Sequence, residues 1–156
     1  MRGITALAIA AATALASAAA TSAAGSNAAA YRAQVNAICR SYTPKLRSLE
    51  ADMAAAKKAG DTGRYGYDAG YILALALKEG LRVEHAAVPT DAQRQMVAPL
   101  RRLHSVDVVL RRTLAAAVAG DSRAFAAGAV QVAKLAAPLN RQFDAVGLRD
   151  CGSNQQ

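Results

Sequence analysis

Apolar residues recur at steps of three or four along most of the chain after residue 26, the spacing that places them on one face of an α-helix. Breaks in the pattern predict four helices, at about 27–58, 62–87, 91–118 and 122–146. The expected core positions are Tyr31, Val35, Ile38, Tyr42, Leu46, Leu49 and Met53; Met96, Leu100, Leu103, Leu110 and Leu114; and Phe125, Val132, Leu135, Leu139, Phe143 and Val146. No segment bounded by turn residues shows the alternation of apolar and polar positions that is typical of a strand.

The predicted second helix has a different pattern. Its segment 71–77, Tyr-Ile-Leu-Ala-Leu-Ala-Leu, is apolar on every side. A helix without a polar face belongs in the interior. We therefore expect this helix to be the most buried of the four.

The helix boundaries have recognisable turn chemistry. Ala-Gly-Asp occurs at 59–61 and again at 119–121. In each copy, Gly is suited to end one helix in the left-handed conformation, and Asp is suited to cap the next. A third boundary is predicted at 89–91, Pro-Thr-Asp, with Thr or Asp as the cap.

Three prolines fall within the predicted helices. Pro44 and Pro138 should kink the first and fourth helices, because each lacks a backbone donor. Pro99 lies early in the third and indicates that this helix begins later than residue 91.

Short connections favour antiparallel neighbours, so we predict an all-α fold, an up-down-up-down four-helix bundle. This topology places the first and fourth helices side by side. Gly147 is expected to end the fourth helix and to turn the C-terminal segment back toward the first.

The N-terminal segment has the composition of an export signal. Arg2 precedes an apolar and small-residue run to about residue 20, and 22–24 (Ser-Ala-Ala) or 18–20 (Ala-Ala-Ala) fits a cleavage site. An uncleaved anchor is the alternative. We predict a signal peptide at 1–24, a single domain at 25–156, and a secreted or periplasmic, cell-envelope location.

Cys39 and Cys151 are the only cysteines of the chain. In an exported protein two cysteines predict one disulfide. The bridge would tie the C-terminal segment to the first helix and would close a loop of more than 100 residues.

Two short motifs carry a resemblance to other proteins. The stretch 31–40, Tyr-Arg-Ala-Gln-Val-Asn-Ala-Ile-Cys-Arg, and the closing 147–151, Gly-Leu-Arg-Asp-Cys, resemble a group of uncharacterised small exported bacterial proteins. Members pair a Cys in the first mature helix with a Cys just after a terminal Gly-Leu. The resemblance implies a disulfide-linked helical bundle and no particular activity.

The chain is strongly basic, with a net charge of +8 and a pI of about 10.0. Much of the charge lies in the third helix, at Arg94, Arg101, Arg102, Arg111 and Arg112. A cationic exported protein is suited to anionic lipid or a wall polymer, although these residues also fit an ordinary solvated face. Nucleic acid is not an expected partner, because the sequence contains no known nucleic-acid-binding motif.

The sequence lacks the common catalytic and cofactor motifs. It contains no CxxCH, ExxH, HExxH, P-loop or GxSxG pattern, so we expect no enzyme activity and no cofactor. Non-covalent haem ligation by Met53, Met96 and His104 is a weak alternative, since both methionines fit core positions. His85 and His104 should lie too far apart along the bundle axis to share a metal, and no metal site is predicted.

Glu79 and Asp107 lie close to apolar helix faces, where a carboxylate needs a partner. Along the axis of the predicted bundle, Arg47 lies at about the same level as Asp107. His104 or Arg101 lies at about the same level as Glu79. One interpretation is a ligand pocket at Glu79, His104 and Asp107. The other is a set of ion pairs at the edge of the core.

Three tyrosines, at 65, 67 and 71, lie beside glycines at 63, 66 and 70. They fit either an aromatic binding patch or a cap on the end of the bundle. Taken together, the sequence predicts a non-catalytic envelope protein that associates with an anionic surface or with another envelope protein. The alternative is a small-ligand or metal carrier with a site inside the bundle.

Overall fold

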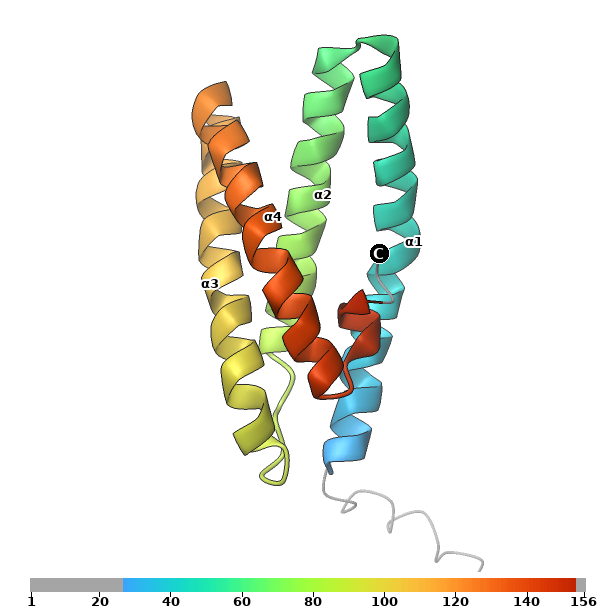
Figure 1. The fold of residues 1–156 in the computed structure, drawn as a ribbon, viewed down its shortest axis with the longest axis vertical. Coiled ribbons are helices and arrows are strands. Elements are labelled where there is room, and N and C mark those ends of the chain that lie inside the picture. Colours follow the sequence, from blue (N-terminus) through green and yellow to red (C-terminus); the bar gives the residue numbers. More distant parts are fainter. Residues whose placement is uncertain (1–26, 154–156) are drawn as a thin grey trace, which may run out of the picture.

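The computed structural model describes residues 27–153 and contains four long helices (Figure 1). They are α1 (Ala28–Ala59), α2 (Thr62–Glu84), α3 (Gln93–Val118) and α4 (Ser122–Ala145), followed by the short 3₁₀ helix η1 (Arg149–Cys151). The predicted all-α, sequentially antiparallel fold is confirmed. The predicted signal peptide lies outside the described residues. Within 27–153, no helix is both long enough and apolar enough to cross a membrane.

The two Ala-Gly-Asp turns have the same geometry, as predicted. Gly60 and Gly120 adopt φ values of 72° and 71°. The next residue caps the following helix: Asp61 accepts a hydrogen bond from the Arg64 backbone N–H and Asp121 from that of Ala124, both at 2.9 Å. Each hairpin is therefore closed by a left-handed glycine and a carboxylate cap.

The boundary between α2 and α3 differs from the prediction. α2 ends at Glu84, and α3 begins at Gln93 without a side-chain cap. The Asp91 carboxylate instead accepts a hydrogen bond from the Ala28 N–H at 3.0 Å, at the start of α1. Asp91 thus satisfies a backbone donor of a helix 63 residues away rather than of its own.

All three prolines remain inside their helices. Pro44 lies in α1, Pro99 in α3 and Pro138 in α4. The start of α3 at Gln93 rather than residue 91 agrees with the direction that Pro99 indicated.

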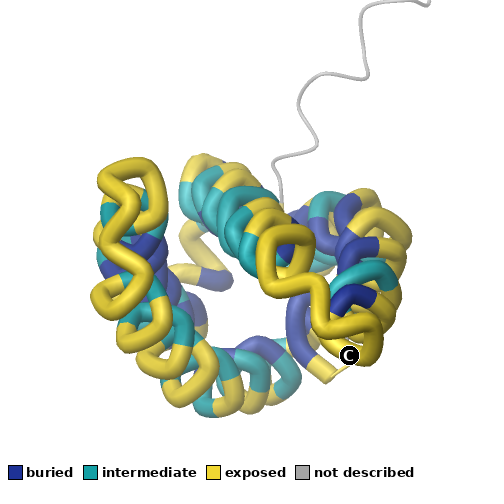
Figure 2. Tube along the Cα trace, turned by 90° about the horizontal axis from the view of Figure 1, so that it is seen from above, coloured by how far each residue is buried: buried dark blue, intermediate teal, exposed yellow. Residues whose placement is uncertain are grey.

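The helices form two hairpins that meet along one edge. α1 packs on α2, α3 packs on α4, and α2 packs on α3. Among the described helices, α1 and α4 lack an extensive contact, so the predicted side-by-side arrangement of first and fourth helices is wrong. The hairpins diverge toward their Ala-Gly-Asp turns (Figures 1 and 2).

The C-terminal segment fills the gap between α1 and α4 and packs on both. Gly147, at φ 83°, ends the α4 region as predicted, and Leu148 is fully buried just after it. The predicted disulfide is present: Cys39 of α1 is joined to Cys151 of η1, with a Cα–Cα distance of 5.1 Å.

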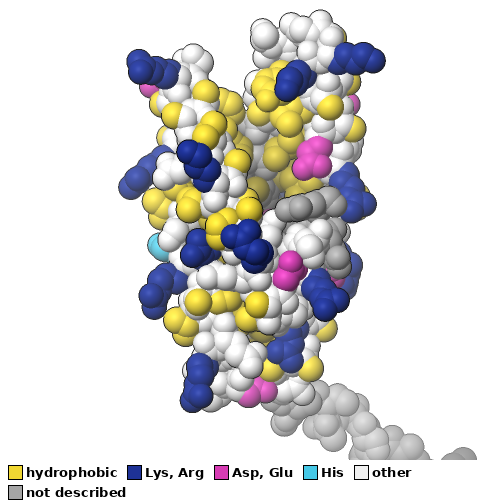
Figure 3. Space-filling model, viewed as in Figure 1, with side chains coloured by type: hydrophobic (Ala, Val, Ile, Leu, Met, Phe, Trp, Pro, Cys, Tyr) yellow, Lys and Arg dark blue, Asp and Glu magenta, His cyan; other side chains and the backbone are white. Residues whose placement is uncertain are grey.

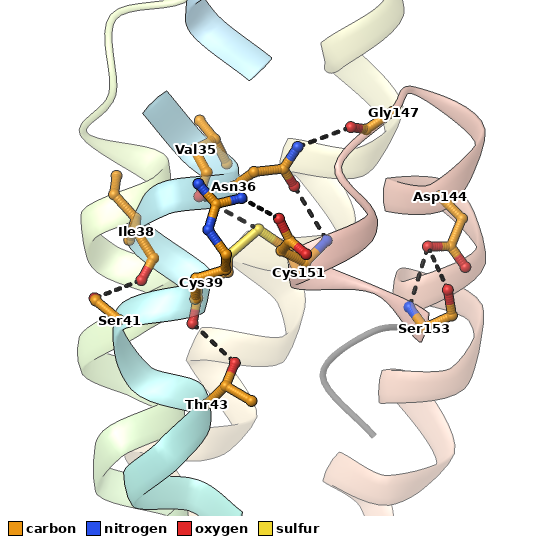
Figure 4. Close-up of a disulfide and its surroundings, with 12 residues drawn as sticks. Val35, Asn36, Ile38, Cys39, Ser41, Thr43, Asp144, Gly147, Cys151 and Ser153 are labelled. Carbon is orange, nitrogen blue, oxygen red and sulfur yellow. Dashed lines mark hydrogen bonds and ion pairs between the residues drawn. A yellow bond between two sulfur atoms is a disulfide. The ribbon is translucent and has the colours of Figure 1, made fainter. Parts of the chain in front are cut away.

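Polar contacts hold this segment on both sides of the bridge (Figure 4). On the α1 side, the Asn36 amide donates to the Gly147 carbonyl at 3.0 Å and accepts from the Asp150 N–H at 3.1 Å. On the α4 side, the Asp144 carboxylate accepts from the Ser153 N–H at 3.1 Å. An ion pair between Arg40 and Asp150 adds to the α1 side.

The core is concentrated at the end of the molecule that contains the disulfide. Its buried apolar residues include Tyr31, Val35, Val83, Met96, Leu103, Leu110, Leu139, Phe143 and Leu148. Nearer the start of α4, in the direction of the Ala-Gly-Asp turns, Phe125, Val132 and Leu135 are only half-buried. Packing is therefore tight at the tied end and looser toward the open end.

The expectation that the second helix is the most buried is wrong. The apolar segment 72–77 of α2 is half-buried throughout, and Val83 is the only large apolar side chain of α2 that is buried. Because the hairpins diverge, part of the apolar surface of α2 faces the space between them instead of a fourth helix.

Gly128 allows α3 and α4 to approach closely. A Cβ built on Gly128 would overlap the Oγ1 atom of buried Thr113. By contrast, a Cβ on Gly70 of α2 would meet nothing within 4 Å. The α3–α4 hairpin therefore depends on the missing side chain at 128.

Reduction of the disulfide is expected to lower the melting temperature without unfolding the helices at room temperature. The bridge spans 112 residues, and the chain-entropy model assigns such a loop at most about 4–5 kcal/mol. Circular dichroism melts with and without reductant should differ by on the order of 10 °C. The double variant Cys39→Ser/Cys151→Ser should melt like the reduced protein and ignore reductant. An unchanged melting temperature would refute the structural role of the bridge.

Gly128→Ala is expected to destabilise the protein by about 1–3 kcal/mol through overpacking against Thr113. Adding Thr113→Ala should recover part of this loss, because it removes Oγ1 and Cγ2 but leaves the Thr113 Cβ, which would still lie 2.9 Å from the new methyl group. Gly70→Ala is the matched control and should be neutral or stabilising by up to about 1 kcal/mol. Urea unfolding of the four proteins measures these differences, and equal effects of the two glycine substitutions would contradict the close approach.

Candidate functional site

A pocket of about 270 Å³ opens between the two hairpins. Figure 3 shows the hollow between them, with hydrophobic side chains on its walls. Every helix contributes to the lining, which is mainly apolar. The apolar side chains that line it are Leu46, Ile72, Ala76, Val83, Leu103, Val106, Leu110, Val132, Ala136, Leu139 and Phe143.

The Asp107 carboxyl group is the most unusual feature of this pocket. Asp107 of α3 is only 2% exposed, and neither of its carboxylate oxygens has a hydrogen-bond partner in the part of the chain that the structure describes. It lies directly against α2, since a Cβ built on Gly80 would come within 2.5 Å of Oδ1. A buried polar group left without a partner costs about 1–3 kcal/mol, and more if it is charged.

Burial raises the pKa of Asp107 to about 7. The nearby Glu84 carboxylate raises this pKa further, whereas Arg111 and His104 lower it. The group is therefore poised between its neutral and charged forms near neutral pH. In the neutral form it can donate a hydrogen bond, and in the charged form it attracts a cation.

Glu79 is the second buried acid of the pocket, at 7% exposure. One of its carboxylate oxygens lies within 4.8 Å of the sulfurs of Cys39 and Cys151. Those sulfurs are bonded to each other, so they offer no thiolate to a metal. In the oxidised protein this cluster is a carboxylate beside a disulfide.

The charged residues that line the pocket all have the same sign. They are Glu50, Glu79 and Asp107, and no Lys, Arg or His is among the lining residues within 27–153. Glu50 is exposed and the other two acids are buried, so negative charge extends from the mouth to the interior. The single neutral polar side chain of the lining is Asn140 of α4.

The structure places two of the three predicted pocket residues together. Glu79 and Asp107 line the pocket, but His104 lies outside it, with 71% of its side chain exposed. His104 contacts Glu84, with its Nδ1 atom 3.3 Å from the carboxylate. Arg47, which we considered as a partner for Asp107, does not hydrogen-bond to it, because the Asp107 oxygens have no hydrogen-bond partner among the described residues.

The methionines and the other histidine are not pocket residues either. Met96 belongs to the core and Met53 is half-buried, so the haem alternative gains no support from their positions. His85 caps the end of α2, where its Nδ1 lies 2.6 Å from the Leu81 carbonyl oxygen.

The basic residues of α3 are spread along the helix. Arg94, Arg101, Arg111 and Arg112 are exposed. Arg102 is half-buried and donates to the Gln142 side chain of α4 at 3.2 Å. On the face drawn in Figure 3, Lys and Arg side chains are distributed over both hairpins rather than gathered in one patch.

The three tyrosines predicted as a binding patch or a cap are at least 40% exposed. The Tyr67 and Tyr71 rings lie 6.4 Å apart, and the Lys45 ammonium lies 5.6 Å from the Tyr71 ring centre. These rings lie near the start of α2 and none of them lines the pocket.

Sequence reasoning missed the residues that make room for the pocket. Ala76, Gly80 and Ala136 are small residues at positions that face the space between the hairpins. On α2 the first two are four residues apart, on the same face as Glu79 and Val83. Small residues on the same helix face as an acid were the available signal.

Comparison with protein-family models, with curated proteins and with solved structures finds no match to this chain. The resemblance to small exported bacterial proteins is therefore supported only as far as a four-helix chain with a Cys39–Cys151 disulfide.

Asp107 is expected to make the stability of the protein fall as pH rises from about 4 to about 7. Its folded-state pKa is raised from 3.8 to about 7, so in this window the folded protein binds more protons than the unfolded chain. The free energy of unfolding should decrease through the window, by on the order of 1–4 kcal/mol, and level off above it.

Asp107→Asn should lose this contribution and become progressively more stable than the native protein as pH rises. Glu50→Gln, which removes an exposed acid of the same pocket, should leave the slope unchanged. Urea unfolding at intervals between pH 4 and pH 8 measures the effect. Parallel curves for the native and Asp107→Asn proteins would show that the carboxyl group is not buried in this way.

Proposed function

We propose that this protein is a non-catalytic binding protein that holds a small, mainly apolar molecule between its two hairpins. The observation that carries the proposal is the pocket of about 270 Å³ with apolar walls and a buried, unpartnered Asp107 carboxyl group. A largely apolar pocket with few convergent polar groups is typical of ligand sites. Protein interiors are ordinarily packed too closely to leave a space of this size.

The chemistry of the lining favours binding over catalysis. Its polar side chains are three carboxyl groups and one amide. General acid–base catalysis by Asp107 would need a second group placed on the reacting atoms. Glu79, the other buried acid, lies beside the disulfide sulfurs, where it is suited to shape the pocket.

The disulfide supports an extracytoplasmic location for this binding function. A bridge between residues 112 apart persists in oxidising compartments. We therefore propose that the protein carries or retains its ligand in the cell envelope or outside it.

Association with an anionic surface or an envelope protein remains the alternative. The exposed arginines of α3 favour it, and the net charge of +8 would strengthen adhesion at low salt. This alternative predicts salt-sensitive binding to anionic vesicles that is independent of the pocket.

Filling the pocket is expected to abolish ligand binding. N-phenyl-1-naphthylamine, an uncharged dye that fluoresces in apolar surroundings, should bind the native protein with saturation. Ala136→Phe places a ring in the pocket and should weaken dye binding at least tenfold. Ala133→Phe, at an exposed position of the same helix, is the matched control and should bind as the native protein does.

Two results would overturn the proposed function. One is the absence of saturable dye binding to the native, oxidised protein. The other is an equal loss of binding in both phenylalanine variants, which would place the dye on the outer surface of α4. Circular dichroism melts of both variants establish that each is folded.

A further inference from the structure

The charge inside the pocket is opposite to the charge of the whole protein. The chain has 19 Lys and Arg against 11 Asp and Glu, yet among the described residues Glu50, Glu79 and Asp107 are the only charged ones that line the pocket. The overall field of the protein attracts anions. The pocket itself is suited to the opposite sign.

The buried carboxyl group gives this charge a specific target. Asp107 is only 2% exposed, and in the described structure both of its oxygens are buried against α2 and lack a hydrogen-bond donor, so a ligand contacts them when the side chain turns toward the pocket. α2 approaches Asp107 with Gly80, which has no side chain and therefore offers no side-chain donor. A donor carried by a ligand would remove the penalty of an unpartnered carboxylate.

The groups around Asp107 also favour a positive ligand. From α2, Glu84 acts on it as a like charge, and Glu79 lines the same pocket. From α3, Arg111 and His104 partly oppose this effect. α1 contributes Glu50 to the lining, and α4 contributes no titratable residue.

The geometry points to a protonated, largely apolar amine as the ligand, with its alkyl or aryl part between the hairpins and its ammonium group against the Asp107 carboxylate. This inference rests on the proposed function and deepens it. The ammonium would supply up to three donors and a compensating charge to a carboxylate that has neither. The apolar part would cover half-buried walls such as Ile72 and Val132.

Three eight-carbon compounds that differ in the head group test this assignment. Octylamine, 1-octanol and octanoate are titrated at pH 8 against the bound naphthylamine dye. At this pH the amine is protonated and Asp107 is mainly ionised. We expect octylamine to displace the dye at a concentration at least tenfold below that of octanol, and octanoate to be the weakest.

Asp107→Asn should bring octylamine to within about twofold of octanol and leave octanol unchanged. Glu50→Gln is the matched control and should retain most of the preference, because Glu50 is exposed at the pocket mouth. A basic protein with no selective pocket would instead bind octanoate best. This order, equal binding of all three compounds, or a preference that persists in Asp107→Asn would overturn the amine assignment.

A second measurement needs no variant. Because burial raises the pKa of Asp107 to about 7 in the unliganded protein, the carboxyl group is partly protonated at pH 7, and an adjacent ammonium lowers its pKa. Octylamine binding should therefore release a fraction of a proton at pH 7, seen by calorimetry in two buffers of different ionisation enthalpy. Binding without proton release would overturn the contact with Asp107. If the dye binds but octylamine does not displace it, the amine assignment is refuted and the proposed binding function stands. If the dye itself does not bind, the proposed binding function is refuted.

Discussion

The attachment of the C-terminal segment to α1 is the constraint on which the arrangement of the helices depends. α1 and α4 do not pack extensively on each other, so the hairpins meet directly only where α2 contacts α3. The Cys39–Cys151 bridge and the contacts of Asn36 with Gly147 and Asp150 close the other side. Because this tie lies toward one end, the hairpins can diverge at the other while the core around Leu148 stays buried (Figures 1 and 4).

The divergence explains why a chain with an amphipathic pattern keeps a pocket. A four-helix bundle closed along its whole length would cover the apolar segment 72–77 of α2 with α4. Here those side chains are half-buried, and two of them, Ile72 and Ala76, line a space of about 270 Å³. The small residues Ala76, Gly80 and Ala136 do not fill it. The arrangement forgoes apolar burial, which is worth roughly 25 cal/mol per Å², and the proposed ligand would restore part of it.

Asp107 connects this incomplete burial with ligand selection. An unpartnered carboxyl group inside the protein destabilises the unliganded state, and the same group would favour a ligand that brings a positive donor. The same residue thus lowers the stability of the unliganded protein and would set the selectivity of the proposed site. The opposite sign of the protein surface would not assist the encounter with a cation, so discrimination has to come from within the pocket.

Much of the fold was determined by local sequence, because helix periodicity and turn chemistry act over a few residues. The four helices, the two Ala-Gly-Asp turns and the turn at Gly147 followed from such patterns, and the disulfide followed from the cysteine count. The candidate site was predictable only in part: Glu79 and Asp107 lay on apolar helix faces, but their depth and partners depend on how separate helices pack. Tertiary structure alone decided that Asp91 accepts a hydrogen bond from the Ala28 N–H at the start of α1 and that His104 lies outside the pocket. It alone also decided that α2 faces a space rather than α4, since these outcomes depend on contacts between residues far apart in the chain.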